Sequence, residues 1–302
     1  MSRAAPFSAR DLGLVALICL AWGCNFLTSA AALRELPPLL FTALRMLVLG
    51  VVLLPWLRRP PRAQWPLLVA VVVCNVVLHF GLSFWSLKLA GDLASPAIVM
   101  QSYVPMAVLL AWLLRGERFA WRTGGAILVS FAGILVLGFD PIVLDNPQSL
   151  LLMLASALAL AVGTVLMRAL SGIDAFAMQA WSAWIGLAPL LAWSALAEPG
   201  AWSTLANASW IAWGGVAWAA LVASLLGHSL FFKLVQKHPV AQIAPYLLMA
   251  PIVAVVLGIV VWGDRPGPRL WLGGAMVLGG VLAIALRTLA KQRVVSPEPT
   301  EI

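Results

Sequence analysis

Residues 11–32, DLGLVALICLAWGCNFLTSAAA, decide the fold class of this chain. A helix needs roughly 20 mostly apolar residues to cross the hydrocarbon core of a bilayer, and this run has that length. The apolar core of a signal peptide has only about 7–15 residues, so we expect the run to remain as a membrane span. Because its apolar residues are continuous and do not alternate with period two, the pattern predicts a helix and not a barrel strand.

The composition extends this prediction to the whole chain. Hydrophobic residues make up 63% of the 302 residues and charged residues only 10%, whereas soluble domains carry about 25% charged residues. The net charge of +8 comes from basic residues in short loops between apolar runs. We therefore interpret it as a topology signal and expect no nucleic-acid partner. Cys19, Cys24 and Cys74 lie inside apolar runs and predict small buried side chains rather than disulfides.

Ten apolar runs follow one another, separated by prolines, glycines and charged residues. We expect spans at 11–32, 38–57, 66–87, 92–114, 123–139, 148–168, 174–197, 209–232, 239–262 and 270–289. With the N-terminus in the cytoplasm, 14 of the 19 Lys and Arg residues fall on the cytoplasmic side and 4 on the outer side. The positive-inside rule therefore predicts ten spans with both termini in the cytoplasm.

The two halves of the chain carry the same proline and glycine motifs in the same order. The fourth span has a proline, then Gly-Glu-Arg, then Gly-Gly-Ala, and the ninth has a proline, then Gly-Asp-Arg, then Gly-Gly-Ala. The matched sets are Pro105, 116–118 and 124–126, and Pro251, 263–265 and 273–275. Because five spans is an odd number, two such repeats must have opposite orientations, which is the plan of many secondary carriers.

We therefore predict an all-α membrane protein of ten transmembrane helices, built as two inverted five-helix repeats. The expected parts are a first repeat at 1–140, a second repeat at 141–290 and a cytoplasmic tail at 291–302. In this plan a substrate site lies near the bilayer midplane, between the repeats.

The chain resembles a known family at several motifs. The run Ala21-Trp22-Gly23-Cys24-Asn25-Phe26, Arg45, and Pro105 with its Gly-Glu-Arg are similar to motifs of the drug/metabolite transporter superfamily, in its ten-helix EamA-type branch. The resemblance covers about residues 10–290 and is strongest to bacterial aromatic amino acid exporters. It implies export of amino acids or related metabolites through a central cavity, a bacterial inner membrane, and peripheral fifth and tenth helices. In the second repeat, Val162 and Val165 replace the Trp22 and Asn25 of this opening motif.

Polar residues inside spans usually face the bundle interior or a wet cavity, because lipid penalises them. In the third span Asn75, His79, Ser83 and Ser86 recur at spacings of 4, 4 and 3, which places them on one helical face. We interpret this stripe as a cavity wall, with hydrogen bonding between helices as the alternative. Arg45 is a candidate for holding a substrate carboxylate, and the alternative is a structural cation bonded within the bundle.

The remaining candidates are polar, aromatic and methionine side chains placed deep in spans, which suit an adaptable cavity. The predicted substrate-binding residues are Trp22, Asn25, Arg45, Asn75, His79, Ser83, Gln101, Tyr103, Trp181, Trp184, Ser224, His228, Tyr246 and Met249. A tryptophan in such a position more often packs than binds. Pro105 and Pro251 are predicted hinges for alternating access, with static kinks as the alternative.

The acidic residues bear on the driving force. All 11 Asp and Glu residues fall in loops or at span ends, whereas ion-driven carriers often place a carboxylate at depth. The hypothesis is therefore facilitated export, with no metal or cofactor, and a proton relay through His79 or His228 is the alternative. Walker A, His-Glu-x-x-His and Gly-x-Ser-x-Gly motifs do not occur, so no enzyme activity is predicted.

The expected partners are a small-molecule substrate and the lipid bilayer, with the protein as a monomer or weak homodimer. Export of other amphiphilic metabolites or drugs, with or without proton coupling, stays open as a second hypothesis. A membrane scaffold that transports nothing is the alternative of a different class.

Overall fold

The computed structural model describes residues 7–238 and 240–295, and these form helices and no strand. Within them, nine helical stretches are long and apolar enough to cross a membrane, and Pro38–Val52 is a shorter apolar helix. Large apolar side chains are exposed around the bundle, among them Leu128 (70%), Leu151 (65%) and Val260 (76%). Such a surface suits lipid and not water. The prediction of an all-α membrane protein with ten spans is confirmed.

The spans of the first half are α1 (Ala9–Leu33), α2 (Pro38–Val52), a third span of α3 (Trp65–Val72), η3 (Val73–Leu78) and α4 (His79–Ala90), a fourth of α5 (Ala94–Met100) and α6 (Tyr103–Arg115), and α7 (Trp121–Gly138). Those of the second half are α9 (Pro147–Met167), α10 (Ala175–Ala197), an eighth span of α11 (Trp210–Ala217), η5 (Trp218–Gly227) and α12 (His228–Val235), a ninth of α13 (Val240–Leu247), α14 (Met249–Leu257) and η6 (Gly258–Trp262), and α15 (Pro268–Val295). Short helices lie in the connections: η1 (Leu54–Trp56), η2 (Arg62–Gln64), α8 (Pro141–Leu144) and η4 (Ala201–Asn207).

These bounds agree with the predicted spans to within a few residues, with two exceptions. The regular part of α2 ends at Val52, because Pro55 falls in the 3-10 turn η1 that follows it. The tenth span runs on to Val295, so the first five residues of the predicted tail are helical. The rest of that tail, residues 296–302, lies outside the described residues.

Local sequence sets the helix ends. Ser8 and Asp11 form a capping box that starts α1. Pro38 and Pro147 occupy first positions of α2 and α9, where a missing N–H is harmless. Gly116 and Gly263 end the fourth and ninth spans with φ of 66° and 87°, a left-handed conformation that favours glycine. The two halves therefore end their matching spans in the same way.

The helices pack in a pattern that is preserved when the two halves are exchanged. The second and seventh spans (α2 and α10) lie side by side, as do the fifth and tenth (α7 and α15). The third span packs on the sixth through α4 and α9, and the eighth packs on the first through η5 and α1. The fourth packs on the sixth and the ninth on the first. This correspondence is the expected result of an inverted repeat.

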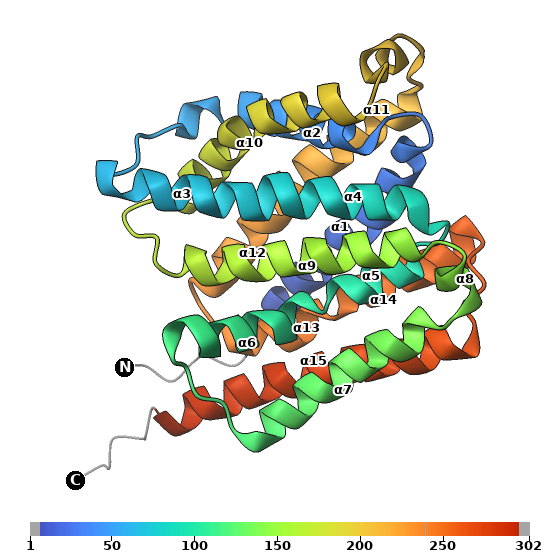
Figure 1. The fold of residues 1–302 in the computed structure, drawn as a ribbon. Coiled ribbons are helices and arrows are strands. Elements are labelled where there is room, and N and C mark those ends of the chain that lie inside the picture. Colours follow the sequence, from blue (N-terminus) through green and yellow to red (C-terminus); the bar gives the residue numbers. More distant parts are fainter. Residues whose placement is uncertain (1–6, 239, 296–302) are drawn as a thin grey trace.

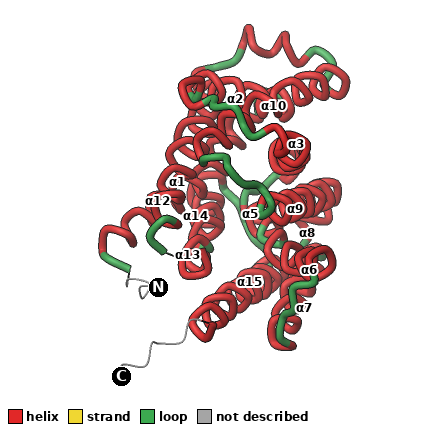
Figure 2. Tube along the Cα trace, turned by 90° about the vertical axis from the view of Figure 1, so that its left-hand side faces the viewer, coloured by secondary structure: helices red, strands yellow, loops and turns green. Residues whose placement is uncertain are grey.

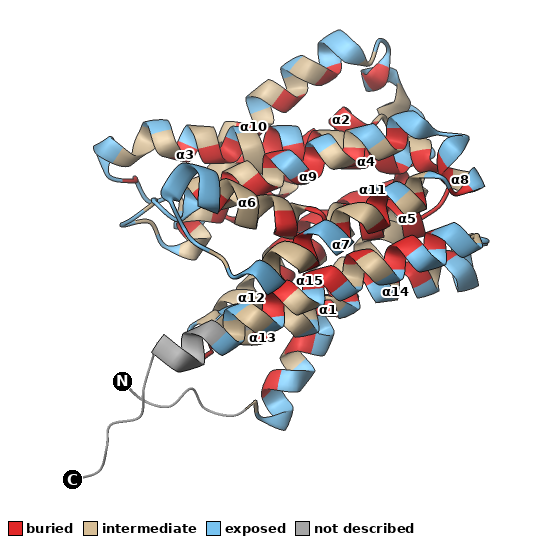
Figure 3. Ribbon diagram, turned by 60° about the horizontal axis from the view of Figure 1, so that its bottom comes forward, coloured by how far each residue is buried: buried red, intermediate tan, exposed pale blue. Residues whose placement is uncertain are grey.

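Figures 1 and 2 place α7 and α15 together at one edge of the bundle, so the fifth and tenth helices are peripheral, as the resemblance implied. Buried residues gather where helices pack, such as α4 against α2 and against α9, and exposed residues mark the outward sides (Figure 3). Helix α1 begins and α15 ends at the same end of the bundle (Figure 1). We call this end the terminal face and the other end the opposite face.

The fourth and ninth spans are both broken near their middles. Helix α5 stops at Met100 and α6 resumes at Tyr103, and α13 stops at Leu247 before α14. A proline lacks an N–H and crowds the carbonyl four residues earlier, and these positions are Gln101 for Pro105 and Leu247 for Pro251. At the first break the chain forms a tighter turn of the 3-10 type, because Val104 N donates to Gln101 O, three residues back, at 3.1 Å. The breaks match the predicted proline positions, and their action as hinges stays a prediction.

Matching irregularities also occur in the third and eighth spans, which contain the π-helical segments η3 and η5. A π-helical turn carries extra residues and changes which side chains share a face, and such turns are frequent at functional sites. In this chain η5 carries Ser224 and η3 carries Asn75, both of which the sequence singled out.

Candidate functional site

Arg45 lies inside the bundle, where α2, α4 and η5 converge. Its side chain is only 2% exposed. Its Nε and Nη2 donate hydrogen bonds to Ser224 Oγ at 3.1 and 2.8 Å. The guanidinium carbon lies 3.9 Å from the ring centroid of Phe80 and 5.5 Å from that of Phe84. A cation at these distances is attracted to the ring faces, so one buried charge joins three membrane-spanning segments.

The π-helical segment explains how Ser224 reaches Arg45. Ser224 Oγ donates to Ala219 O at 2.7 Å, five residues earlier in η5. A hydroxyl has one hydrogen and two acceptor lone pairs, so the two bonds from Arg45 complete its capacity. Ser224 therefore orients the guanidinium but supplies no negative charge.

Trp22 of α1 lies beside the segment that carries Ser224. Its Nε1 donates to Ala223 O at 3.0 Å, next to Ser224. Its ring lies 5.4 Å from the His228 ring and 6.1 Å from the Phe231 ring. We call the resulting group the central cluster, which consists of Trp22, Arg45, Phe80, Phe84, Ser224, His228 and Phe231.

Four members of the central cluster, Trp22, Arg45, Ser224 and His228, were predicted from the sequence. Its phenylalanines were not. In a chain this apolar, a phenylalanine carries no signature that separates a site from packing. The spacing of four between Phe80 and Phe84, on the span with the polar stripe, was the one available signal.

The polar stripe of the third span faces α9. Ser156 Oγ donates to His79 O at 2.9 Å, so it accepts from His79 Nδ1 at 2.8 Å. In the same way Ser86 Oγ donates to Ser149 O at 2.8 Å, and Ser149 Oγ donates to Ser86 O at 3.0 Å. These geometries favour hydrogen bonding between helices, the alternative stated for the stripe. Asn75 contacts Gly163 of α9, and Ser83 Oγ donates to Phe80 O at 3.2 Å.

Other predicted residues bond within their own segment. Asn25 Oδ1 accepts from Ser29 Oγ at 3.4 Å, both in α1. Gln101 Nε2 lies 3.5 Å from Ala97 O, one turn earlier, at the break of the fourth span. Tyr103 follows this break and is half-buried.

The predicted tryptophans of the seventh span lie away from the central cluster. Trp184 Nε1 donates to Gly50 O of α2 at 3.2 Å. Trp181 Nε1 donates to Arg58 O at 2.7 Å, in the connection after η1, and packs edge-on against Trp65. Trp181 is therefore near the terminal face and not deep, which corrects the expectation. The indole of Trp184 joins the second and seventh spans, and that of Trp181 joins the seventh span to the connection that follows the second.

The two candidates of the ninth span are partly exposed. Tyr246 is 39% exposed, and its ring lies 5.1 Å from that of Phe7, which precedes α1. Met249 is 48% exposed. Tyr246 thus points toward the terminal face, because the proline-bearing helix α13 packs against the start of the chain. The expectation that it approaches the centre is corrected.

Four carboxylates tie the halves together at the opposite face. Each caps helix N-terminal amides that belong to the other half, which satisfies donors left free by the helix. The bonds are Glu35 with Ser209 N at 2.7 Å, Glu198 with Leu39 N at 2.8 Å and Leu40 N at 3.0 Å, Asp264 with Leu93 N at 2.9 Å and Ala94 N at 3.2 Å, and Asp140 with Leu270 N at 2.9 Å.

Burial and neighbouring charge perturb the titration of this face. Asp92 is 2% exposed, and its burial, with the charges of Asp264 and Asp140 nearby, raises its pKa to about 6. Burial also raises the pKa of Asp264. By contrast, hydrogen bonds from Ser209 lower the pKa of Glu35.

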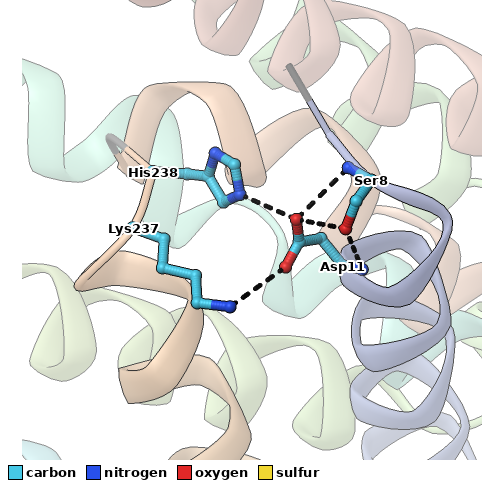
Figure 4. Close-up of polar contacts among 4 residues, drawn as sticks. All are labelled: Ser8, Asp11, Lys237 and His238. Carbon is cyan, nitrogen blue, oxygen red and sulfur yellow. Dashed lines mark hydrogen bonds and ion pairs between the residues drawn. The ribbon is translucent and has the colours of Figure 1, made fainter. Parts of the chain in front are cut away.

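The terminal face has a smaller polar cluster, shown in Figure 4. The Asp11 carboxylate accepts from Ser8 Oγ at 2.7 Å, and lies 3.2 Å from His238 Nε2 and 3.8 Å from Lys237 Nζ. These contacts join the start of α1 to the connection between α12 and α13. In the part of the chain that the structure describes, no group of His, Cys, Asp and Glu gathers to hold a metal ion.

A family model described as the EamA-like transporter family matches the chain twice, over residues 11–139 and 148–286. The chain belongs to the EamA-like transporter family. Each match falls in one half of the chain. The predicted resemblance is therefore confirmed, and the protein is a multi-pass membrane transporter.

Similar proteins in bacteria carry transporter names. The uncharacterized transporter YvbV of Bacillus subtilis (strain 168) is 31% identical over 264 residues, which are 80% of this chain and 81% of the relative. A probable amino-acid metabolite efflux pump of Escherichia coli (strain K12) is 22% identical over 282 residues, 91% of this chain and 94% of the relative. A probable terminal-alkyne amino-acid exporter of Streptantibioticus cattleyicolor is 26% identical over 247 residues, 78% of each chain.

A crystal structure of another protein shares the fold. It superposes with a TM-score of 0.63 over 96% of this chain and 100% of the other, at 22% sequence identity. At this identity the likeness supports the architecture alone.

Proposed function

We propose that this EamA-family protein exports amino acids, aromatic ones among them, and related small metabolites across the bacterial inner membrane. The observation that carries the proposal is the central cluster. It combines a buried cation with aromatic faces inside a bundle of inverted repeats, which suits a small molecule that has a carboxylate and an apolar side chain. Relatives named as an amino-acid metabolite efflux pump and an amino-acid exporter support the same substrate class.

The transport mechanism is alternating access. The terminal face is the cytoplasmic one, since the sequence assigns 14 of the 19 basic residues to the side of the two termini. Substrate enters from this face, and the halves rock so that the bonds of Asp264 to Leu93 and Ala94 at the opposite face separate. The matched breaks at Gln101 and Leu247 supply the bending points, because a broken helix bends with little loss of hydrogen bonds.

The driving force is the substrate gradient. Four carboxylates at the ends of the spans are engaged in helix caps, including Glu198 on α2 and Asp264 on α5. His79, one of the two candidate proton relays with His228, is bonded to Ser156 between two packed helices. Both observations favour facilitated export over proton coupling.

The test is counterflow of labelled amino acids and cationic drugs into liposomes that contain the purified protein. We expect accumulation of at least one amino acid, at a rate that does not change when a pH gradient is imposed. Protein-free liposomes are the control. Uptake of cationic drugs but of no amino acid, or flux that requires the pH gradient, would contradict the proposal, and no flux at all would favour a scaffold.

A further inference from the structure

The guanidinium of Arg45 is a buried charge with hydrogen-bonding capacity left over. It has five N–H donors, and Ser224 takes one from Nε and one from Nη2. Among the described residues, Nη1 has no hydrogen-bond partner although it is fully buried. The outer edge of the guanidinium, from Nη1 to the second hydrogen of Nη2, is therefore available.

The chain supplies this charge with no described counter-ion. Of the ion pairs among the described residues, none includes Arg45. Ser224 is neutral and its bonds are complete, and the Phe80 ring offers only a weak attraction. A buried charge without an anionic partner is strongly destabilising, so an anion from outside the protein would stabilise the closed bundle.

The free edge has the geometry of a carboxylate site. Two parallel N–H bonds from one guanidinium match the two oxygens of a carboxylate. Ser224 fixes one edge of Arg45 and the face of Phe80 fixes its plane, so the remaining edge is held in one orientation. A phosphate would bring a second negative charge, and the central cluster has one cation.

We propose that Arg45 binds the carboxylate of the transported substrate and that Phe80 and Phe84 contact its side chain. The substrate class is then a monocarboxylate with an aromatic or large apolar group. This proposal rests on the proposed function and names the residue that holds the exported amino acid. Because Nη1 is enclosed in this conformation, the carboxylate reaches it when the halves rock open and neutralises it when they close.

The experiment compares two competitors of labelled phenylalanine in counterflow. The first is 3-phenylpropionate, which has the carboxylate but no amine, and the second is phenylalaninamide, which has the amine but no carboxylate. With the wild type we expect 3-phenylpropionate to inhibit at a concentration at least about 10-fold lower than phenylalaninamide does, as for a charge-assisted pair. In Arg45→Gln the ratio of the two inhibitory concentrations should fall to within about 2-fold. Arg45→Lys should give an intermediate ratio, because lysine keeps a point charge without the two parallel donors of arginine.

The matched control is Arg34→Gln. Arg34 also stacks on an aromatic ring, Trp262, at 4.0 Å, but it lies at the opposite face, outside the central cluster. This variant should keep the wild-type ratio. Equal inhibition by both competitors in the wild type, or an unchanged ratio in Arg45→Gln, would overturn the proposal.

Failure of the proposed function is distinguishable from failure of this inference. If the wild type moves no labelled phenylalanine, a titration of tryptophan fluorescence with the same two competitors tests Arg45 alone, since Trp22 lies in the central cluster. Preference for 3-phenylpropionate that is lost in Arg45→Gln would support the inference, and binding of neither or of both equally would refute it. If Arg45→Gln does not fold, the ratio for the two competitors is measured with Arg45→Met and Arg45→Lys instead.

Discussion

At the scale of single residues, Ser224 is the side chain on which the orientation of Arg45 depends. Ser224→Ala removes the acceptor of two hydrogen bonds, and bonds to a charged group contribute about 1.5–3 kcal/mol each. We expect the KM of counterflow to rise by about 10-fold or more, with a smaller change in kcat. Ser229→Ala is the control, because among the described residues Ser229 Oγ bonds only to Leu225 O of its own span. Equal effects of the two substitutions would show that Ser224 does not position Arg45.

Asp92 at the opposite face should make the stability of the protein decrease as the pH rises. Its pKa is raised from 3.8 to about 6, so the folded protein binds this proton more tightly than the unfolded chain. The associated stability is full below the unfolded pKa and is lost as the pH rises through about 6. Its size is on the order of 1–3 kcal/mol.

The melting temperature in detergent checks this prediction, with a thiol-reactive dye that reports exposure of the three free cysteines. From about pH 5 to about pH 7.5 the wild type should lose a few degrees, and Asp92→Asn should lose less. Asn keeps an oxygen that accepts from Ser95 N, as Asp92 does at 2.7 Å. Asp145→Asn, at an exposed acid of the same face, should behave as the wild type. An unchanged slope in Asp92→Asn would refute the assignment.

At the scale of elements, the broken fourth and ninth spans are predicted to move. Pro105→Ala and Pro251→Ala each restore an N–H that can bond four residues back, at the position of the break. Each should raise the melting temperature, since removing an interior proline favours a helix by up to about 3 kcal/mol, and should slow counterflow. Pro189 lies inside α10, which stays continuous, so Pro189→Ala is the control for a proline without a break. Faster or unchanged transport in the first two variants would identify the breaks as static.

Elements were also the scale at which the sequence was most informative. The spans were predictable because lipid demands about 20 apolar residues per helix, and the breaks because of the prolines. Which neighbour each polar side chain contacts was less predictable from the sequence. The spacing of Asn75 and His79 assumes 3.6 residues per turn, but the π-helical segment η3 intervenes. Periodicity also fits a cavity wall and a helix interface equally, and only the positions of Ser149 and Ser156 on α9 separate them.

At the scale of the whole molecule, the orientation in the membrane is a prediction. Arg59 and Arg265 are both exposed and lie in connections at the two different faces. In intact spheroplasts, an impermeant maleimide should label Arg265→Cys but should label Arg59→Cys only after permeabilisation. Labelling of both positions, or the reverse pattern, would contradict a cytoplasmic terminal face.

The central claim is that the two halves separate at the opposite face in every transport cycle. Asp264 and Ala94 belong to different halves and bond there at 3.2 Å, between the ninth span, which packs on the first, and the fourth span, which packs on the sixth. The direct test is phenylalanine counterflow by the double variant Asp264→Cys and Ala94→Cys, before and after linking with a short bifunctional thiosulfonate. We predict flux in the unlinked protein, loss of flux on linking and recovery after reduction. Flux that continues at the same rate in the linked protein would contradict alternating access through this face.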